Sequence, residues 1–217
     1  MNLFDVMSEI DDRAPQTQRI TGIVIGVVTN NNDDVGKMGR VKVRYPWLGK
    51  DDESNWARVA APMAGEGRGI YFLPELEDEV LVAFEHGDMR FPVVIGSLWN
   101  GKDAPPDPNE NGENNIRVIK SRSGHIIRLN DEKDKEKIEI IDKSEKNSIV
   151  FDTANNTITI TTDKDITLSA SKGKITLDAK EIEIKSSSDA TTIKSGAGMD
   201  VEASGTMNIK GSTVNIN

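Results

Sequence analysis

Residues 157–217 read TITITTDKDITLSASKGKITLDAKEIEIKSSSDATTIKSGAGMDVEASGTMNIKGSTVNIN, and this stretch decides the fold. An apolar, a polar and an apolar residue stand together, as in Ile158-Thr159-Ile160, and a polar corner follows. The same group returns about every eight residues, which is the mark of stacked supersecondary units. The pattern loosens between residues 185 and 206 and tightens again towards residue 217.

Alternation with period two predicts a strand with one buried face. A β-solenoid made by one chain needs roughly twenty or more residues per coil to enclose a core. Eight-residue units supply one wall only, so we expect three identical chains to close a triangular prism around a shared axis. The predicted trimer core consists of the inward apolar residues, which are Ile158, Ile160, Ile166, Leu168, Ile175, Leu177, Ile182, Ile184, Ile193, Val201, Met207 and Ile209.

The composition narrows the class of protein. Acidic residues outnumber basic ones by 36 to 27, a formal charge of −9, which argues against a general binder of nucleic acid or anionic membranes. The chain has no cysteine, so disulfides and thiolate sites are excluded. Residues 1–13 lack the apolar run of a signal peptide, and we expect the protein to be made in the cytoplasm.

The predicted fold class is all-β, with four segments along the chain. Residues 1–18 read as an amphipathic lead, and residues 19–100 read as five or six short strands of an OB-type barrel, one of them over residues 69–73. Alternation over residues 40–45 predicts that Val41, Val43 and Tyr45 face inward. Residues 101–115 are dense in Pro, Asn, Asp and Gly and predict a linker. Residues 116–217 are expected to form a collar followed by the trimeric β-helix needle.

The barrel region carries further motifs. They are Gly39–Trp47 (GRVKVRYPW), Trp56–Ala60 (WARVA), Gly65–Gly69 (GEGRG), Phe72–Glu75 (FLPE), Asp78–Phe84 (DEVLVAF), Gly87-Asp88 and Arg90–Gly96 (RFPVVIG). Ile119–His125 and Asn147–Val150 follow downstream. In order and spacing, this set resembles the central spike proteins of contractile injection systems. That family includes phage baseplate assembly protein V and the valine–glycine repeat spikes of type VI secretion.

The resemblance implies a homotrimer with OB barrels at its base and an interwound triangular β-helix pointing at the target. Such a spike sits in the baseplate under the tail tube of a phage tail or phage-tail-like particle. Sheath contraction drives it through an envelope, so the target membrane is a transient partner. It needs no cofactor and has no enzymatic activity. About ten units from Ile138 to Ile216, each rising by roughly 4.8 Å, predict a needle on the order of 50 Å long.

Two departures from the family define expected partners. Some members carry a tube-hub domain ahead of the barrel, whereas only residues 1–18 precede it here. We therefore expect a separate hub protein, contacted by Leu3, Phe4, Val6, Met7 and Ile10. Some phage spikes end in a His-x-His iron site, which is missing here. We expect a tip protein of the proline–alanine–alanine–arginine (PAAR) repeat type on Val214, Asn215, Ile216 and Asn217.

Several other residues are weaker candidates for a functional site, and each also has a purely structural interpretation. The histidines His86 and His125 could be ligands but are more often structural, and Asp163 and Asp165 lack the spacing of a calcium loop. Gly65, Gly67 and Gly69 suggest a tight turn rather than a phosphate loop, because no Lys-Ser/Thr element follows. The tryptophans Trp47, Trp56 and Trp99 could form a binding platform or pack in a core or interface. Gly196 and Gly198 indicate a bulge or corner.

Two other functions compete with the spike. Arg40, Lys42 and Arg44 line one face of a predicted strand, so the barrel could bind an oligonucleotide or another ligand, with the β-solenoid as a passive tail. The acidic chain favours a solvated or inter-subunit face, and we expect no binding of nucleic acid. The other alternative is an enzyme with a hydrolase domain between the barrel and the needle. It is disfavoured because the linker at residues 101–115 is too short to hold such a domain.

Overall fold

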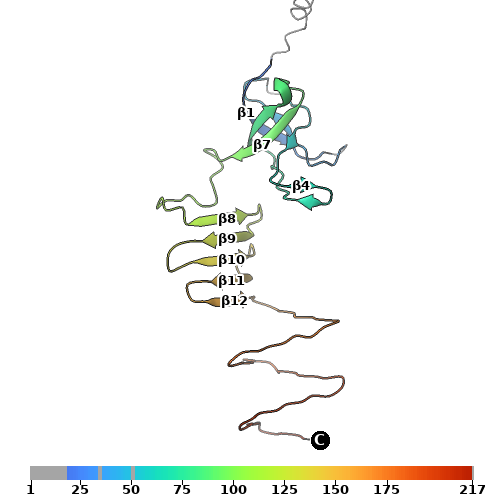
Figure 1. Ribbon diagram of the computed structural model, residues 1–217, viewed down its shortest axis with the longest axis vertical. Coiled ribbons are helices and arrows are strands. Elements are labelled where there is room, and N and C mark those ends of the chain that lie inside the picture. The colour runs from blue at the N-terminus through green and yellow to red at the C-terminus, as the bar shows by residue number, and fades with distance from the viewer. Residues whose placement is uncertain (1–18, 34–35, 50–51, 217) are drawn as a thin grey trace, which may run out of the picture. The chain divides into compact units, whose positions relative to one another are not determined.

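The computed structural model describes residues 19–33, 36–49 and 52–216 (Figure 1). By contacts it divides into two units, one ending at Asp163 and the other running from Lys164 to the C-terminus. Among the described residues, none of the helices has the length and apolarity needed to cross a membrane. The expected all-β class is confirmed, since the regular elements are strands apart from the short 3-10 turn η1 (Glu85–Gly87).

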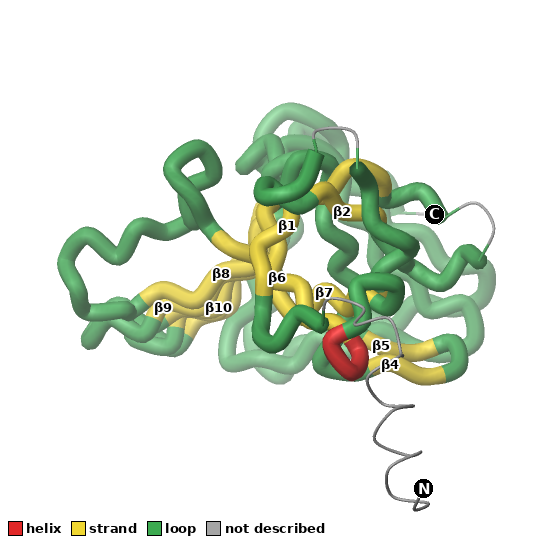
Figure 2. The backbone as a smooth tube through the Cα atoms, turned by 90° about the horizontal axis from the view of Figure 1, so that it is seen from above, coloured by secondary structure: helices red, strands yellow, loops and turns green. Residues whose placement is uncertain are grey.

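A five-stranded sheet forms the barrel region, in the order β2-β1-β6-β7-β3. Its strands are β1 (Val24–Asn30), β2 (Lys42–Arg44), β3 (Arg58–Val59), β6 (Glu79–Phe84) and β7 (Pro92–Leu98). The β3–β7 pair is parallel and the other pairs are antiparallel. The backbones of Val41 and Ala57 exchange hydrogen bonds of 3.0 and 2.7 Å. This bridge joins the two outer strands of the sheet, so the sheet curls back on itself (Figure 2).

The described buried core lies entirely in this region. Alternation places Val41, Val43 and Tyr45 inside, as the sequence predicts, with at most 2% of each residue exposed. They pack with Val28, Ala57, Val80, Val82, Phe84 and Val94. The rings of Tyr45 and Phe84 lie 5.7 Å apart and fill the centre. Burial raises the pKa of the Tyr45 hydroxyl to about 12, so this phenol stays neutral in the core.

A two-stranded hairpin, β4 (Ala64–Gly65) and β5 (Arg68–Gly69), forms a sheet of its own. The predicted strand over residues 69–73 is wrong, because β5 ends at Gly69 and the side chains of Tyr71 and Phe72 are exposed. Ile70 N donates to Met63 O at 3.0 Å, and that bond is the last rung of the ladder.

Beyond residues 99–115, which contain no strand, the chain forms an antiparallel meander in the order β12-β11-β10-β9-β8. Its strands have five residues each: β8 (Ile116–Lys120), β9 (Ile126–Asn130), β10 (Lys137–Ile141), β11 (Ser148–Asp152) and β12 (Thr157–Thr161). Figure 1 shows them as a stack of alternating arrows. The units counted from Ile138 therefore begin as hairpin-connected strands rather than an interwound coil. The expected rise is unchanged, because each strand still occupies about one spacing of 4.8 Å.

The second unit is an open coil. Residues 164–216 run back and forth in extended passes that form no strand with one another (Figure 1). Gly173 N donates to Ala170 O at 3.2 Å and closes one corner. Backbone N–H and C=O groups are obligatory hydrogen-bonding groups, so extended passes of this kind need neighbours to pair with.

Candidate assembly surface

One side of the meander is an apolar face made of two columns of side chains. The first column places Ile119, Ile127, Ile140, Ile149 and Ile160 opposite one another in register. The second column contains Leu129, Ile138, Phe151 and Ile158. Arg117 stands at the β8 end of this second column, where it pairs with Asp131. Strand alternation aligns these residues on one face because the register of every hairpin is unbroken.

Eight of these nine apolar side chains are exposed in the single chain, including Ile158 at 67%. The other side of the sheet is mixed: it carries ion pairs together with partly buried aliphatic residues, namely Ile116, Val118, Ile126, Ile141 and Val150. Arg128 Nε donates to Glu139 Oε2 at 2.6 Å, and Lys137 Nζ lies 3.3 Å from Asp152 Oδ2. The carboxylates of Glu139 and Asp152 thus neutralise the Arg128 guanidinium and the Lys137 ammonium on this face. A sheet with an ion-paired side and a bare apolar side needs a partner for the bare side.

The same apolar–polar–apolar spacing returns in the sequence of residues 164–216. Each unit presents a first and a second apolar residue around one polar residue. The first residues, Ile166, Ile175, Ile182, Met199, Met207 and Val214, are between 46% and 56% exposed. The second residues, Leu168, Leu177, Ile184, Ile193, Val201, Ile209 and Ile216, are between 66% and 87% exposed. All twelve predicted core residues are therefore uncovered in one chain, and their role as a trimer core stays a prediction.

Sequence reasoning missed part of this surface. Met199 belongs to it, because Met199 and Val201 flank one polar residue just as Met207 and Ile209 do in the next unit. The signal that identifies it is the repeat spacing, because Met199 lies eight residues before Met207. Of the nine apolar residues on the face of the meander, the sequence predicts only Ile158 and Ile160 as inward residues. The collar that precedes them has no inward residues assigned.

One unit of the coil departs from the pattern. Thr191 holds the first place of its unit, where every other unit from residue 166 onward has an apolar residue. The second place of the same unit is Ile193, which is 70% exposed like the second residues of its neighbours. The unit therefore presents one apolar side chain instead of two.

The predicted end contacts are placed only in part. Val214 and Ile216 are exposed around Asn215, and Ile216 is the most exposed large hydrophobic residue at 87%. Asn217 and the predicted hub contacts Leu3, Phe4, Val6, Met7 and Ile10 lie outside the described residues.

The weaker candidate residues have local structural surroundings rather than a shared site. His125 Nδ1 accepts a hydrogen bond from Lys143 N at 3.2 Å, and His86 lies in η1 with a φ of 53°. Asp163 Oδ2 receives Lys146 Nζ at 2.8 Å, an ion pair next to the end of β12, and Asp165 is exposed. Within the described part of the chain, the His, Asp and Glu side chains form no group of three that could hold a metal ion.

The basic strand is largely neutralised by its neighbours. Arg40 Nε donates to the buried Asp33 carboxylate at 2.7 Å, and Lys42 Nζ lies 3.1 Å from Glu53 Oε2. The Arg40 guanidinium, aided by the amides of Gly36 and Met38, holds the pKa of Asp33 far below its usual range. Arg40 and Lys42 therefore serve the barrel's own loops, which favours the structural interpretation of this strand over an oligonucleotide site.

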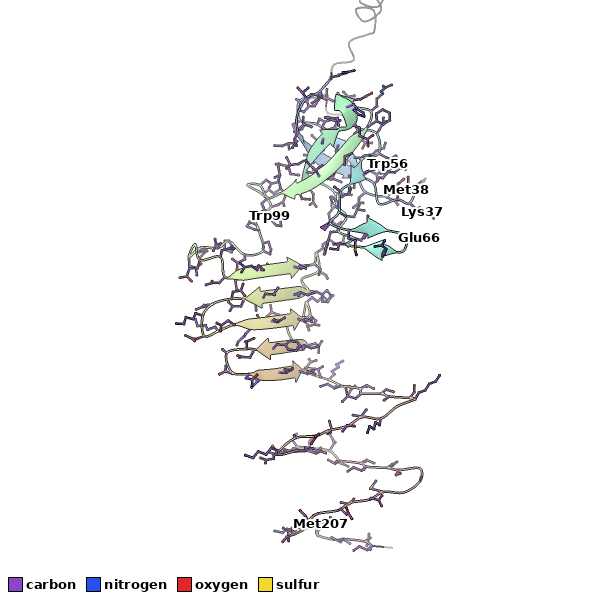
Figure 3. All side chains as sticks on the ribbon, viewed as in Figure 1. Lys37, Met38, Trp56, Glu66, Trp99 and Met207 are labelled. Carbon is purple, nitrogen blue, oxygen red and sulfur yellow. The ribbon has the colours of Figure 1, made fainter. Side chains whose placement is uncertain are left out.

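The glycines and tryptophans also have local roles. Glu66 and Gly67 form the turn of the β4–β5 hairpin, where Gly67 has a φ of 62°, so the glycine motif is a tight turn. Trp47 stacks on Tyr45 with ring centroids 5.5 Å apart, and Lys42 lies 5.6 Å from the Trp56 ring centre. Trp99 is 66% exposed and points away from the barrel core (Figure 3).

Comparison with known proteins relates the barrel region to a known domain family. Residues 24–99 match the family described as the type VI secretion system/phage-baseplate injector OB domain. The type VI secretion system spike protein VgrG4b of Pseudomonas aeruginosa is 35% identical over 134 residues, 55% of this chain and 16% of that protein. The spike protein VgrG1a of the same organism is 29% identical over 124 residues, 52% of this chain and 19% of that protein.

The actin cross-linking toxin VgrG1 of Vibrio cholerae is 35% identical over 72 residues, 31% of this chain. That match covers 7% of the toxin's length, so its printed activity is a statement about that protein. This chain spans less than a fifth of the length of these three relatives, at 16%, 7% and 19%.

Proposed function

This chain belongs to the phage baseplate V and type VI secretion spike family, and we propose that three copies of it form the puncturing spike of a contractile injection machine. Membership places the chain among baseplate spike proteins with an OB domain. It also confirms that the chain is a structural protein and not an enzyme. The trimer, its partners and its action on an envelope are the content of the proposal.

The observation that carries the proposal is the exposure of the repeated apolar side chains within each unit, in the two columns of the meander and in the apolar pairs of residues 166–216. Burying one such side chain stabilises an assembly by about 1.5–3 kcal/mol. One chain supplies a single wall and does not cover these side chains, as the exposure of Ile158, Ile175 and Ile209 demonstrates. Three walls facing one axis would bury them and leave the ion-paired face of the meander outside.

The backbone of the coil requires the same solution. Residues 164–216 make no strand with themselves, so their N–H and C=O groups lack ladder partners in the single chain. β12 is paired only with β11, which leaves its second edge free for another copy. If passes of the other two chains fill the space between passes of the first, every strand is paired on both edges. The prism then resists bending, because each chain is hydrogen-bonded to the other two.

The two ends would contact other proteins of the machine. We propose a hub protein at the barrel end, contacted by the lead of residues 1–18, and a PAAR-type tip protein at the needle end. Support for the tip comes from Val214 and Ile216, whose exposed side chains continue the inward pairs. In the assembled particle the spike stands in the baseplate of a phage tail or a phage-tail-like machine, below the tube. Contraction would drive it through the target membrane.

A cysteine scan tests the trimer, and the cysteine-free sequence makes it clean. Ile209→Cys would place three thiols around one axial layer, and mild oxidation should give disulfide-linked dimers within the trimer. Asn208→Cys, its outward neighbour, is the matched control and should stay unlinked. Equal cross-linking of the two variants would contradict the inward assignment. Immunogold labelling of purified tail particles then tests the location, where label along the tube instead of at the baseplate end would contradict it.

A further inference from the structure

The unit around Thr191 and Ile193 differs from every other unit of the coil. From residue 166 onward the first inward place holds an isoleucine, a methionine or a valine, and only here a threonine. Between Ile184 and Met199 the chain has one large apolar side chain, Ile193. In a threefold assembly this layer loses three aliphatic side chains at once. We propose that residues 186–198 form a soft joint that divides the needle into two stiffer halves.

Local hydrogen bonds strengthen this assignment. Ser186 Oγ donates to Asp189 O at 2.5 Å on one side of the unit. Ser195 Oγ donates to Gly198 O at 2.7 Å and accepts from Ala197 N on the other side. Serine side chains that satisfy nearby backbone groups compete with ladder pairing. Both corners of the unit are thus closed by their own side chains and depend less on neighbouring strands than a bare corner does.

Glycine adds backbone freedom at the same place. A Cβ added at Gly196 or Gly198 would meet no atom within 4 Å in the single chain, so packing in this chain does not require glycine there. Glycine loses more conformational entropy on ordering than other residues, which lowers the stability of an ordered corner. The neighbouring units around Ile182 and Met199 each keep both inward side chains, and the corners on their far sides contain no more than one glycine each.

The consequence is mechanical. Local opening in a folded protein starts where few apolar contacts and many exposed backbone bonds coincide. Residues 158–184 on one side and 199–216 on the other each keep an unbroken inward set. Opening at the joint would let the tip-bearing half tilt without separating the three chains. The joint rests on the proposed trimer, since a single chain has no axial layer.

Hydrogen exchange on the full-length chain tests the joint, after light scattering has established a trimer. We expect amides in residues 186–198 to have protection factors at least about tenfold lower than those in residues 174–185 and 199–210. Thr191→Ile restores the inward pair and should bring the segment towards the protection of its flanks. Thr192→Ile, the matched outward control, should leave it unchanged.

The outcomes separate the two proposals. Absence of a trimer would contradict the proposed function. A trimer in which residues 186–198 are as protected as both flanks would overturn the joint alone. An equal effect of Thr191→Ile and Thr192→Ile would also overturn it, because the effect would then come from added hydrophobicity rather than from the axial layer.

Discussion

Replacing Ile175 by aspartate puts three carboxylates on one layer of the prism. Ile175 is the first inward residue of its unit and is 53% exposed in the single chain. The proposed assembly would have to cover this exposed part. At an effective dielectric constant of about 20 and separations of roughly 6 Å, each carboxylate pair repels by about 3 kcal/mol, or about 8 kcal/mol per layer. Lost burial of the isoleucines adds about 1.5–3 kcal/mol per chain. The sum, on the order of 10 kcal/mol per trimer, rivals the whole stability of a typical domain.

The assay is the solution mass of Ile175→Asp by light scattering at pH 8 and at pH 4. We expect the trimer to be lost at pH 8. Burial and mutual repulsion raise the pKa of these carboxyl groups, so protonation at pH 4 should restore part of the assembly. Thr176→Asp carries the same charge on the outward neighbour and should remain a trimer at both pH values. A stable trimer of Ile175→Asp at pH 8 would refute the inward assignment.

Three further predictions follow from the same geometry. Phe151→Ala, on the apolar face, should lower the stability of the trimer by about 3 kcal/mol per chain in chemical denaturation. Thr159→Ala, at an exposed position on the opposite face, should cost under about 1 kcal/mol, and equal losses would contradict the assignment of faces. Asp33→Asn should lower the urea midpoint of the barrel at pH 7. Because the pKa of Asp33 is lowered in the folded chain, its contribution is fully present above about pH 4 and fades as the pH falls towards the folded pKa. The difference in stability between wild type and variant should therefore shrink steadily between pH 4 and pH 2. A single-stranded oligonucleotide should not bind at about 0.15 M salt in a polarisation assay, and retention there would revive the oligonucleotide-binding alternative.

The sequence predicts the inward and outward faces well, because strand alternation is local. Val41, Val43 and Tyr45 are buried as expected. The inward side of Ile166 and Leu168 stays a prediction, because both are exposed in the single chain. Periodicity of two depends only on each residue's own backbone, so it survives whatever the strand pairs with.

Pairing partners are harder to predict, because alternation carries no information on direction. The meander of β8–β12 is antiparallel and hairpin-connected, whereas its isoleucines repeat much like those of the later coil. Turns decide the difference. Asn156, with a φ of 53°, reverses the chain between β11 and β12, and Glu145, with a φ of 60°, does so between β10 and β11. The described corners after Thr161 bring no two passes into a ladder, so those passes stay unpaired within the chain.

Assembly depends on contacts that a single chain does not contain. The described buried core belongs to the barrel, and every large apolar side chain of residues 158–216 is exposed until another copy covers it. In the proposed trimer, local sequence sets which side chains face the axis, but their stabilising contacts would exist only between chains. The same reason explains why Thr191 does not stand out among the many threonines of the sequence. Its effect on stability would depend on the side chains of the other two chains in its layer of the proposed trimer.

The most direct test of the central claim is the solution mass of the purified chain by light scattering, with circular dichroism on the same sample. The account predicts one species at three times 23.8 kDa, rich in β-structure and without a folded monomer at lower concentration. A folded monomer of 23.8 kDa would contradict it, because residues 164–216 would then have to fold without the partners that their apolar pairs and unpaired backbone require.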